Sequence, residues 1–285
     1  MFDIIVVGGG PAGVSAAIYL KRFKLDVAII MKDMGTLKKT DHIENYYGFP
    51  DPIKGQDLFE NGIIQAKRFL IPIFTEEVLN IDYFDTFTVK TNIGVHESKT
   101  VLLATGANRV NLRVKGFQDY VGKGISYCAI CDGFIYRNKK IGLIGSSEFM
   151  LEELEILKNF SSEITIFTNG ATLEVDVSGY NVVSEPLTLI KGKEVITSVN
   201  TQNQEYLVDV LFVAMGTPSA ADFALRMGAF INKNDIVVDD NFMTNIPGLF
   251  AAGDCIGGLL QIVKAADDGA KAALAINKYL RHVTS

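Results

Sequence analysis

The sequence carries one close pair of cysteines, in the run Cys128-Ala129-Ile130-Cys131-Asp132. Two residues between cysteines, at a turn into a helix, allow a small disulfide ring to open and close with little movement of the backbone. A thiolate at such a turn is stabilised by the helix N-terminus. Asp132 directly follows the second cysteine and is placed to hold or deliver a proton as a thiolate leaves. Cys128, Cys131 and Asp132 are therefore the candidate catalytic residues of a redox centre.

A zinc half-site is the alternative for two such cysteines, and it needs two further ligands. The remaining candidates are Cys255 and the three histidines at 42, 96 and 282, and they show no ligand spacing. We therefore predict no metal. Cys255, beside Gly253-Asp254, is interpreted as a small buried side chain and not as a third catalytic group.

A glycine-rich turn lies near the start of the chain. Gly8-Gly9-Gly10-Pro11-Ala12-Gly13 satisfies G-x-G-x-x-G directly after an apolar strand and before a helix expected over 12–23. In this motif Gly8 permits the tight turn, Gly10 lets a pyrophosphate approach the backbone, and Gly13 lets helix and strand pack closely. The helix N-terminus adds free N–H groups and a partial positive charge. The combination predicts a dinucleotide site.

The acid that usually binds the ribose hydroxyls of a dinucleotide is missing. The second strand, 27–30, is followed by Met31, Lys32 and Asp33 instead. Either Asp33 reaches the ribose, or Lys32 and the backbone hold the ligand, and the residues leave both alternatives open.

The strand, glycine and helix pattern occurs twice. Residues 3–10 and 140–147 each run from a buried strand through glycine into a helix-like stretch, which is how a βαβ dinucleotide unit begins. The end of the chain returns to the first pattern, with an apolar strand at 249–252, Gly253-Asp254 and an Ala-rich amphipathic helix at 261–279. The first domain is therefore expected to be discontinuous.

This pattern predicts an α/β fold of two Rossmann-like, three-layer dinucleotide-binding domains, the second inserted into the first. We expect residues 1–112 and 243–285 to form the first domain and residues 113–242, which carry the cysteine pair, to form the inserted domain. Linkers are expected near 111–115 and 239–244.

Composition and charge narrow the function classes. The 285 residues are 48% hydrophobic and 21% charged, which indicates a globular chain of about two domains on the usual prior. The net charge is -6, and residues 113–242 carry the whole excess, with 11 Lys+Arg against 17 Asp+Glu. An acidic segment repels polyanions, so a nucleic-acid partner is not expected.

The chain has no sign of a membrane segment. No apolar run reaches the roughly 18 residues of a membrane span, and the N-terminus runs into an apolar strand without the basic region of a signal peptide. The expected location is the cytoplasm.

Five motifs resemble the low-molecular-weight thioredoxin reductase family. In chain order they are Gly8-Gly9-Gly10-Pro11-Ala12-Gly13, Glu44-Asn45-Tyr46-Tyr47-Gly48-Phe49, Ala104-Thr105-Gly106-Ala107, Cys128-Ala129-Ile130-Cys131-Asp132-Gly133-Phe134 and Ala251-Ala252-Gly253-Asp254. The resemblance implies FAD in the first domain, a homodimer, and electron flow from the flavin to the cysteine disulfide and on to thioredoxin. It further implies that Cys131 faces the flavin, that Cys128 attacks the protein disulfide, and that Asp132 is the acid.

The resemblance also implies which residues hold the flavin. Besides the glycine turn with Gly8, Gly10, Pro11, Ala12 and Gly13, they are Met31, Lys32, Thr36, Asn45, Val78, Ala104, Thr105, Gly106, Asp254, Gln261 and Ile262. Thr36 stands where the family commonly has glutamine, and Leu260 where an arginine commonly precedes Gln261. The alternative for Asn45 and Gln261 is a structural role, in which their side chains stabilise a turn or cap a helix.

The second glycine turn departs from the family, whose second domain binds NADPH through G-x-G-x-x-A. The turn reads Gly145-Ser146-Ser147-Glu148-Phe149-Met150. Ser147 adds a side chain where backbone should touch pyrophosphate, and Met150 is bulky where helix and strand should pack closely. Ser146 or Ser147 is expected to cap the helix. Glu148 repels a diphosphate, since two unit charges ~4 Å apart cost ~1 kcal/mol in water and ~4 at an effective dielectric of 20.

The segment that grips the 2'-phosphate of NADPH in the family, a His-Arg-Arg stretch, is also changed. It reads Ile166-Phe167-Thr168-Asn169-Gly170, and residues 159–190 contain no Lys or Arg. A 2'-phosphate would find no partner there. We therefore predict that the inserted domain does not bind NADPH, the alternative being a drifted site that still binds NADH weakly.

A preserved flavin cradle and cysteine pair without a nicotinamide site resemble the ferredoxin-dependent flavin thioredoxin reductases. This resemblance implies that reduced ferredoxin passes two single electrons to FAD, from which they reach the cysteine pair and then thioredoxin. Ferredoxins are usually acidic, so docking is expected on a basic patch. The candidate clusters are Lys21, Arg22 and Lys24; Lys38 and Lys39; and Arg137, Lys139 and Lys140.

Three other functions stay open at the level of the sequence. They are an NADPH-dependent thioredoxin reductase, a dithiol oxidase in which reduced flavin hands electrons to oxygen, and a non-enzymatic flavin-bound redox sensor. Rapid bleaching of the flavin by NADPH would indicate the first, peroxide formed during oxidation of a small dithiol the second, and partner binding that survives cysteine-to-serine substitution without turnover by any donor the third.

Overall fold

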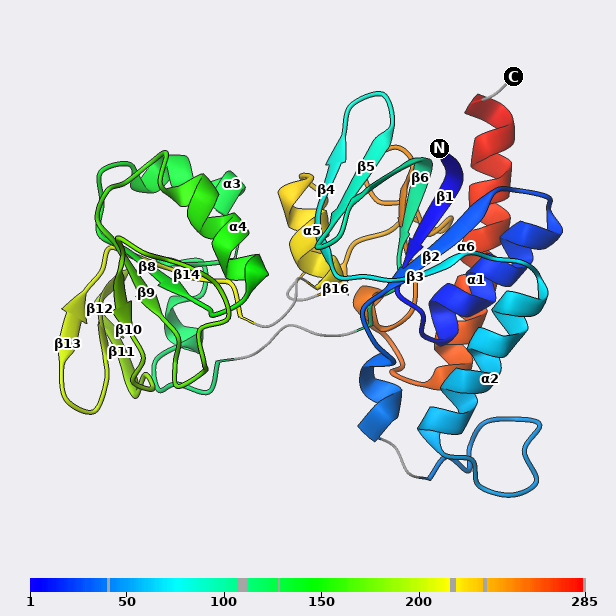
Figure 1. Ribbon diagram of the computed structural model, residues 1–285, viewed down its shortest axis with the longest axis horizontal. Coiled ribbons are helices and arrows are strands. Elements are labelled where there is room, and N and C mark those ends of the chain that lie inside the picture. The colour runs from blue at the N-terminus through cyan, green and yellow to red at the C-terminus, as the bar shows by residue number, and fades with distance from the viewer. Residues whose placement is uncertain (40–41, 107–111, 128, 216–218, 233–234, 284–285) are drawn as a thin grey trace. The chain divides into compact units, whose positions relative to one another are not determined.

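The computed structural model describes residues 1–39, 42–106, 112–127, 129–215, 219–232 and 235–283, without the side chains of Lys39, Ile130 and Cys131. The chain divides into two compact units (Figure 1). Unit 1 comprises Met1–Arg109 and Ser219–Ser285, and unit 2 comprises Val110–Pro218. The α/β class predicted from the sequence is confirmed.

The chain returns to unit 1 at Ser219, well before the expected boundary at residue 243. Helix α5 (Ala220–Arg226) begins there with a capping box, in which Ser219 and Asp222 each bond the backbone N–H of the other. The buried face of α5 shares one core with the central strands of unit 1. Two short strands follow α5 and pair with each other, β15 (Ile231–Asn232) and β16 (Asp235–Ile236).

Unit 1 is built on a seven-stranded sheet in which the order β3-β2-β1-β6-β17 is parallel. Its strands are β1 (Phe2–Val7), β2 (Val27–Met31), β3 (Ile73–Thr75), β4 (Val78–Tyr83), β5 (Phe87–Thr91), β6 (Val95–Leu103) and β17 (Leu249–Ala251). Strand β6 has two partners along one edge, because its first half pairs with β5 in the antiparallel β4-β5 hairpin and its second half pairs with β17. The carboxyl ends of β1, β6 and β17 therefore meet at one end of the sheet.

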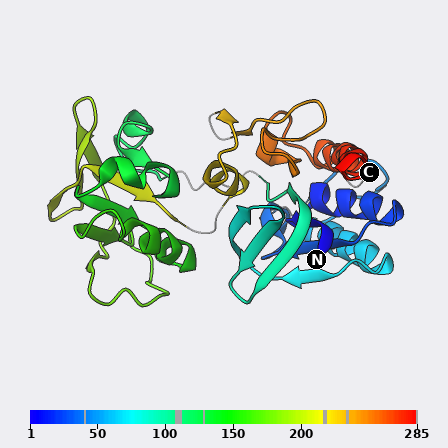
Figure 2. The same cartoon turned by 90° about the horizontal axis from the view of Figure 1, so that it is seen from above.

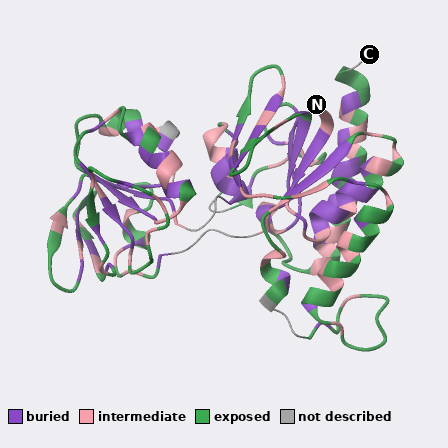
Figure 3. Ribbon diagram, in the orientation of Figure 1, coloured by how far each residue is buried: buried purple, intermediate pink, exposed green. Residues whose placement is uncertain are grey.

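Helices cover both faces of this sheet. The helices of unit 1 besides α5 are α1 (Pro11–Arg22), α2 (Gly55–Arg68) and α6 (Ile262–Val283), with short 3-10 turns η1 (Gly35–Lys39) and η4 (Asp254–Ile256). Alternate residues of β1 explain the layering: Ile4 and Val6 pack with α1 and α6, whereas Ile5 and Val7 pack with α5 and the β4-β5 hairpin. Figure 2 shows α1 (blue) beside α6 (red), and Figure 3 shows the central strands buried.

Unit 2 is a second parallel sheet, of order β10-β9-β8-β14-β7. Its strands are β7 (Ile125–Ser126), β8 (Ile141–Ile144), β9 (Ile164–Phe167), β10 (Asn181–Val183) and β14 (Val210–Val213), with an antiparallel meander β11 (Leu189–Gly192), β12 (Ile196–Asn200) and β13 (Glu205–Leu207). Its helices are α3 (Ala129–Asp132) and α4 (Glu148–Leu157), with 3-10 turns η2 (Gln118–Tyr120) and η3 (Gly133–Tyr136). The helices α3 and α4 pack on one face of the sheet and the meander on the other.

Within the described ranges, no helix combines the length and the apolarity that crossing a membrane requires.

Candidate functional site

The first glycine turn has the geometry of a phosphate cradle. Gly8 has a positive φ of 117°, and a Cβ there would lie 2.3 Å from the carbonyl oxygen of Ala104, so no other residue fits. A Cβ at Gly13 would lie 1.9 Å from the carbonyl oxygen of Gly8. A Cβ at Gly10 would meet nothing within 4 Å. The backbone at Gly10 is thus the open point of the turn, where a ligand can approach.

Helix α1 begins at this open point. Its N-cap is Gly10, no side chain caps it, and its first turn contains no acidic residue. Pro11 at the first helical position lacks an N–H, so the first turn directs the amides of the following residues, Ala12 and Gly13, toward an external acceptor. The helix dipole favours an anion at the same point.

The end of β2 differs from both alternatives raised for the ribose. Both carboxylate oxygens of Asp33 accept hydrogen bonds within its own turn, from the Gly35 N–H (2.7 Å) and the Lys38 ammonium (3.0 Å), and these bonds hold its pKa below the usual value. The Lys32 ammonium lies 2.9 Å from the Glu77 carboxylate. Met31 packs on Gly9, because a Cβ there would meet the Met31 sulfur.

Glu77 is therefore the acid that the structure brings to this end of β2, and sequence reasoning missed it. The neighbouring Glu76 N–H donates to the Met31 carbonyl (2.9 Å), which fixes the segment between β3 and β4 beside β2. One Glu77 carboxylate oxygen is buried without a hydrogen-bond partner among the described residues. The predicted residue Val78 follows it, buried at the start of β4.

Asn45 and Gln261 lie together although they are far apart in the sequence. The Asn45 amide donates to the Gln261 side-chain oxygen (2.9 Å). Gln261 also opens α6, since its carbonyl accepts the Ala265 N–H (3.0 Å). Ile262 is the first residue of α6, and Thr36 lies in η1. The pair joins the 44–49 loop to the start of α6.

Asp254 lies at the carboxyl end of β17 in a tightly held turn. Gly253 has a φ of 86°, and its N–H donates to Asp268 (3.1 Å), which pairs with Lys264 (2.7 Å). The Lys264 ammonium also donates to the carbonyl oxygens of Gly253 (3.1 Å) and Gly257 (2.6 Å). Burial, opposed by Lys264 and aided by Asp268, raises the pKa of Asp254. Its Oδ1 is buried without a partner among the described residues.

The end of β6 completes this edge of the sheet. The Ala104 N–H donates to the Val7 carbonyl (2.8 Å), which holds the end of β6 against the end of β1. The Thr105 hydroxyl accepts the Ala220 N–H (2.9 Å). Gly106 has a positive φ of 79°. These predicted residues, the glycine turn and Asp254 all belong to unit 1 at the carboxyl ends of adjacent parallel strands.

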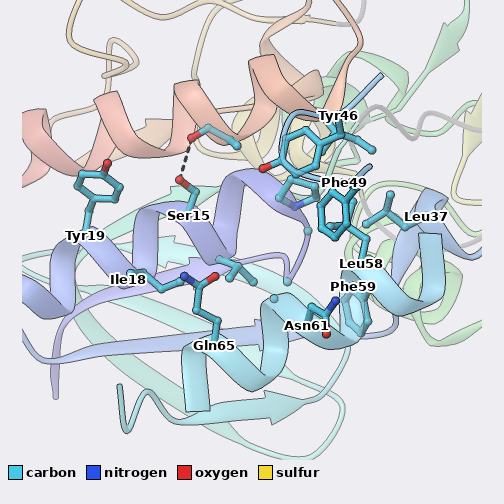
Figure 4. A pocket seen from close by; sticks show the side chains of 17 residues that line it. Ser15, Ile18, Tyr19, Leu37, Tyr46, Phe49, Leu58, Phe59, Asn61 and Gln65 are labelled. Carbon is cyan, nitrogen blue, oxygen red and sulfur yellow. Dashed lines mark hydrogen bonds between the residues drawn. The ribbon is translucent and has the colours of Figure 1, made fainter. Parts of the chain in front are cut away.

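A cavity of about 360 Å³ lies beside the glycine turn (Figure 4). Its walls come from the start and outer face of α1, from α2, from the 46–49 loop and from Ile262. The rings of Tyr46 and Phe49 stack with centroids 6.1 Å apart, and the Ser15 hydroxyl donates to the Ala266 carbonyl (2.8 Å). Of the predicted residues, Gly10, Pro11 and Ile262 line it.

The predicted catalytic pair falls outside the described residues, because Cys128 is not described and Cys131 is described only as backbone of α3. Asp132 is described, and its Oδ2 accepts the Ser126 hydroxyl at 2.6 Å. Burial, and secondarily the charge of Asp132, raises the pKa of Tyr136. Asp132 thus has a hydroxyl and a phenol near it.

The sequence analysis missed a second acid, Glu153, which contacts the residue after Cys128. The Ala129 N–H, the amide directly after Cys128, donates to the Glu153 carboxylate (2.8 Å), and Glu153 is 1% exposed. The signal was present in the spacing, since Glu153 stands three residues after the buried Met150 and four before the buried Leu157. An acid on the apolar face of an amphipathic helix indicates a bonded role.

The second glycine turn has Ser147 and Met150 where the first has Gly10 and Gly13. A Cβ at Gly145 would lie 2.7 Å from the Met150 Cβ, and Met150 is fully buried. The Glu174 N–H donates to the Ser146 carbonyl (2.8 Å), so the segment after β9 crosses the turn. Glu148 lies in the first turn of α4. Ser147 is the N-cap residue, but its side chain makes no capping bond, so the cap predicted for Ser147 is wrong.

The segment after β9 is a structural turn. Asn169 has a positive φ of 52°, and its side-chain oxygen accepts the Leu187 N–H (2.8 Å). The Gly170 N–H donates to the Ser184 carbonyl (2.9 Å). These bonds tie the turn to the strand that follows β10.

Cys255 is buried, and its thiol lies 3.3 Å from the Ala252 carbonyl oxygen and 3.4 Å from that of Leu103. Burial raises its pKa to about 12, in agreement with its interpretation as a packed side chain. Among the residues with described side chains, no three His, Cys, Asp or Glu residues gather as metal ligands would.

Comparisons with known proteins define the class. The family model described as pyridine nucleotide-disulphide oxidoreductase matches residues 2–269. The chain therefore belongs to this family. It is 30% identical to the thioredoxin reductase of Aquifex aeolicus over 98% of this chain and 94% of that protein, and 32% identical to that of Mycoplasma genitalium over 97% and 94%.

Solved structures support the same placement. The atypical thioredoxin reductase TRi from Desulfovibrio vulgaris Hildenborough matches 99% of both chains with a TM-score of 0.91 and 32% identity. A ferredoxin-flavin thioredoxin reductase from Clostridium acetobutylicum matches 100% of this chain and 99% of that one, with a TM-score of 0.71 and 27% identity. Within the family the chain thus stands with the low-molecular-weight thioredoxin reductases, which are FAD-binding flavoproteins.

The residues of unit 1 fit FAD. The turn at Gly10 is open and uncapped, which suits a diphosphate. The orphaned Asp254 oxygen suits a hydroxyl donor, as a ribitol chain carries.

Proposed function

We propose that this protein is an FAD-dependent disulfide oxidoreductase that reduces thioredoxin through Cys128 and Cys131 and takes its electrons from reduced ferredoxin. The observation that carries the choice of donor is the contrast between two turns of equal topology. The turn at Gly10 is open to a phosphate, whereas the second turn has Ser147 at the position of Gly10 and the buried Met150 at the position of Gly13, and the segment that donates the Glu174 N–H to the Ser146 carbonyl crosses it.

Three features disfavour a nicotinamide donor. Ser147 adds a side chain where Gly10 leaves the backbone of the first turn open, and Glu148 adds a negative charge at the start of α4. The 166–170 segment offers no cation to a 2'-phosphate, and the Asn169 side chain is bonded to the Leu187 amide. An enzyme without a nicotinamide site needs another source of electrons, and a small iron-sulfur protein is the class that the similarity to the ferredoxin-flavin enzyme supports.

The residues of unit 1 bind the cofactor in this proposal. The amides after Gly10 hold the diphosphate, the Asn45 and Gln261 pair and Ile262 lie toward the flavin, and Asp254 accepts from the ribitol chain. Bound FAD supplies a carrier that accepts single electrons and delivers a pair. Cys131 faces the flavin, Cys128 attacks the disulfide of thioredoxin, and Asp132 holds the proton that the leaving thiolate takes.

The assembly and the docking surface are part of the same proposal. We expect a homodimer in the cytoplasm, as the family resemblance implies. For an acidic ferredoxin, the clusters 21–24 and 137–140 are the better docking candidates, because Lys38 of the third cluster is already paired with Asp33 (3.0 Å).

The test is an anaerobic titration of the oxidised flavoprotein with reduced ferredoxin, NADPH and NADH side by side. Reduced ferredoxin is expected to bleach the flavin and free two thiols, while equal concentrations of either nicotinamide leave the flavin oxidised. Rapid bleaching by NADPH would overturn the choice of donor and establish an NADPH-dependent enzyme. Failure of all three donors would favour the redox sensor, and peroxide formed from a small dithiol and oxygen would favour the oxidase.

A matched control separates the flavin step from the disulfide step. Cys128→Ser is expected to keep the bleaching by ferredoxin but to abolish thioredoxin reduction. Thioredoxin reduction by this variant at the wild-type rate would remove the cysteine pair from the proposal.

A further inference from the structure

We infer that Lys264 is a positioning residue for the flavin site, whose ammonium ties both ends of the Asp254 turn, residues 253–257, to the first turn of α6. The inference rests on the proposed function, because it assigns what holds Asp254 toward the cofactor. It adds to the site a residue that acts on FAD binding through Asp254.

The geometry is a set of three bonds from one ammonium group. Lys264 Nζ donates to the carbonyl oxygens of Gly253 (3.1 Å) and Gly257 (2.6 Å). It also pairs with the Asp268 carboxylate at 2.7 Å, and this carboxylate accepts the Gly253 N–H (3.1 Å). An ammonium has three N–H donors, so these three acceptors use all of them. The start and the end of the Asp254 turn are therefore both bonded to α6.

Helix stability alone does not explain a lysine at this position. Lys264 is the third residue of α6, where the helix dipole favours an acid and disfavours a cation. Its ion pair with Asp268 places the cation N-terminal to the acid at i,i+4, which is the less favourable order. The Lys264 side chain is only 20% exposed, so its charge is largely withdrawn from water. We therefore assign this side chain a tertiary role, in its bonds to the Asp254 turn.

The Asp254 turn has little rigidity of its own. Gly253 and Gly257 have positive φ angles of 86° and 72°, and glycine loses more conformational freedom on folding than any other residue. Asp254 Oδ1 is buried without a hydrogen-bond partner among the described residues. The direction in which this oxygen faces an external donor depends on the backbone that carries it, and Lys264 bonds that backbone on both sides.

Lys264 also acts on Asp254 through its charge. Burial raises the pKa of Asp254, the Lys264 charge opposes this rise, and Asp268 adds to it. The lysine thus favours the carboxylate form of Asp254, which accepts a stronger hydrogen bond than the neutral acid. The other titratable groups beside the turn are the buried Cys255 thiol and the Asp235 carboxylate on β16, which lies next to Gly257.

The same bonds join two parts of the proposed flavin site. Gln261 lies one turn before Lys264, and its side-chain oxygen accepts the Asn45 amide (2.9 Å). Lys264 therefore fixes the Asp254 turn relative to the start of α6, where Gln261 and Ile262 are proposed to lie toward the flavin.

The test measures the dissociation constant of FAD from the full flavoprotein, by flavin fluorescence during dilution. Lys264→Met removes the ammonium and keeps an unbranched side chain, and it is expected to raise the dissociation constant by about tenfold. Lys264→Arg keeps the charge and the N–H donors, and it is expected to stay within about threefold of wild type. The matched control is Lys271→Met, which removes an exposed lysine of the same helix, paired with Asp267 (2.6 Å), and is expected to change the constant by less than about twofold.

A double-variant cycle separates the positioning role from a general loss of stability. Because Lys264 acts through Asp254, Lys264→Met is expected to weaken FAD binding by less than about twofold once Asp254→Ala is present. A merely structural role would give the full loss of affinity in both backgrounds and would overturn the inference. Failure of Lys264→Arg to restore the affinity would overturn it as well.

A second double variant keeps the test decisive if Lys264→Met folds poorly. Lys264→Met with Asp268→Asn leaves no buried carboxylate without its cation, and the asparagine oxygen still accepts the Gly253 N–H. We expect FAD binding about tenfold weaker than in wild type here too, because both carbonyl oxygens lose their donor.

The outcomes distinguish this inference from the proposed function. Wild-type dissociation constants in all Lys264 variants, beside a weakened Asp254→Ala, would overturn the inference and leave the proposed function intact. A wild-type constant in Asp254→Ala as well would also overturn the proposed arrangement of the cofactor, and a wild-type chain that binds no FAD would overturn the proposed function itself.

Discussion

At the scale of single residues, the buried thiol of Cys255 makes the stability of unit 1 sensitive to alkaline pH. Burial raises its pKa from 9.0 to about 12, so the folded state keeps a proton that the unfolded state loses. The stability contributed by the neutral thiol is fully present below pH 9.0 and is lost as the pH rises toward 12. Between these two pKa values, unfolding releases one proton, and this sets the slope of the unfolding free energy against pH.

We expect wild-type protein to lose about 1 kcal/mol of unfolding free energy relative to Cys255→Ala between about pH 9.5 and about pH 10.5. Urea unfolding of both proteins at the two pH values measures the difference, in which other titrating groups cancel. A difference that stays constant over this range would contradict the burial of the thiol.

Asp254 also carries a prediction at the residue scale, for cofactor retention. Its Oδ1 has no hydrogen-bond partner among the described residues and suits a hydroxyl donor, and a hydrogen bond to a charged group contributes about 1.5–3 kcal/mol. Asp254→Ala is expected to raise the dissociation constant of FAD by about 10- to 100-fold, measured by flavin fluorescence during dilution. The control is Asp267→Ala, which removes an exposed acid paired with Lys271 (2.6 Å) and leaves FAD binding unchanged. Equal losses in both variants would remove Asp254 from the site.

The acids at the end of β2 mark the limit of sequence reasoning at this scale. The motif predicts the close contact of Gly13 with Gly8, because both lie in one local turn, whereas the Ala104 backbone that crowds Gly8 comes from a distant strand. Asp33 was a reasonable candidate by position, yet its oxygens serve its own turn. Glu77 reaches the same place from the end of a neighbouring parallel strand, and no spacing along the chain records that neighbourhood.

At the scale of elements, the close packing of α1 on α6 depends on glycine in the middle of a helix. A Cβ at Gly269 would lie 2.1 Å from the backbone oxygen of Ala12, which cannot move without moving the phosphate turn. We expect Gly269→Ala to destabilise the protein by about 1–3 kcal/mol despite the better helix propensity of alanine. Denaturant unfolding measures this change.

Gly62 in α2 is the matched control for that substitution. A Cβ there would lie 3.7 Å from Val14, which is an ordinary contact. Gly62→Ala is therefore expected to stabilise the protein by about 0.5–1 kcal/mol. The same sign for both substitutions would contradict the close approach of α6 to α1.

Helix α5 shows why the boundary of the inserted segment was placed late. Its capping box is legible in the sequence, since Ser219 and Asp222 have the required spacing. The sequence does not show in which core α5 packs. The residues that α5 contacts, on β1, β6 and the β4-β5 hairpin, lie more than the length of a whole domain earlier in the chain. Sequence periodicity locates an element and its apolar face, and it does not name the sheet that receives that face.

At the scale of the whole molecule, the two units have separate cores. Each of the four buried clusters draws all its residues from one unit. The chain leaves unit 1 and returns to it at neighbouring points, because the Thr105 hydroxyl accepts the Ala220 N–H at 2.9 Å. The described core of unit 1 therefore lies within that unit, as do the residues proposed to hold the flavin.

We expect a spliced chain, with residues 1–106 joined to 219–285 by a Gly-Ser linker of about six residues, to fold and bind FAD. The linker has only a short gap to span, and the two described hydrophobic clusters of unit 1 draw all their residues from that unit. Cooperative urea unfolding and a yellow, stoichiometric flavoprotein would support this, and the separate segment 110–218 should fold without flavin. Adding reduced ferredoxin to the spliced protein would free no thiols, since the cysteine pair is gone. A spliced chain that is unfolded, while the full chain binds FAD, would show that unit 1 depends on the inserted segment for its core.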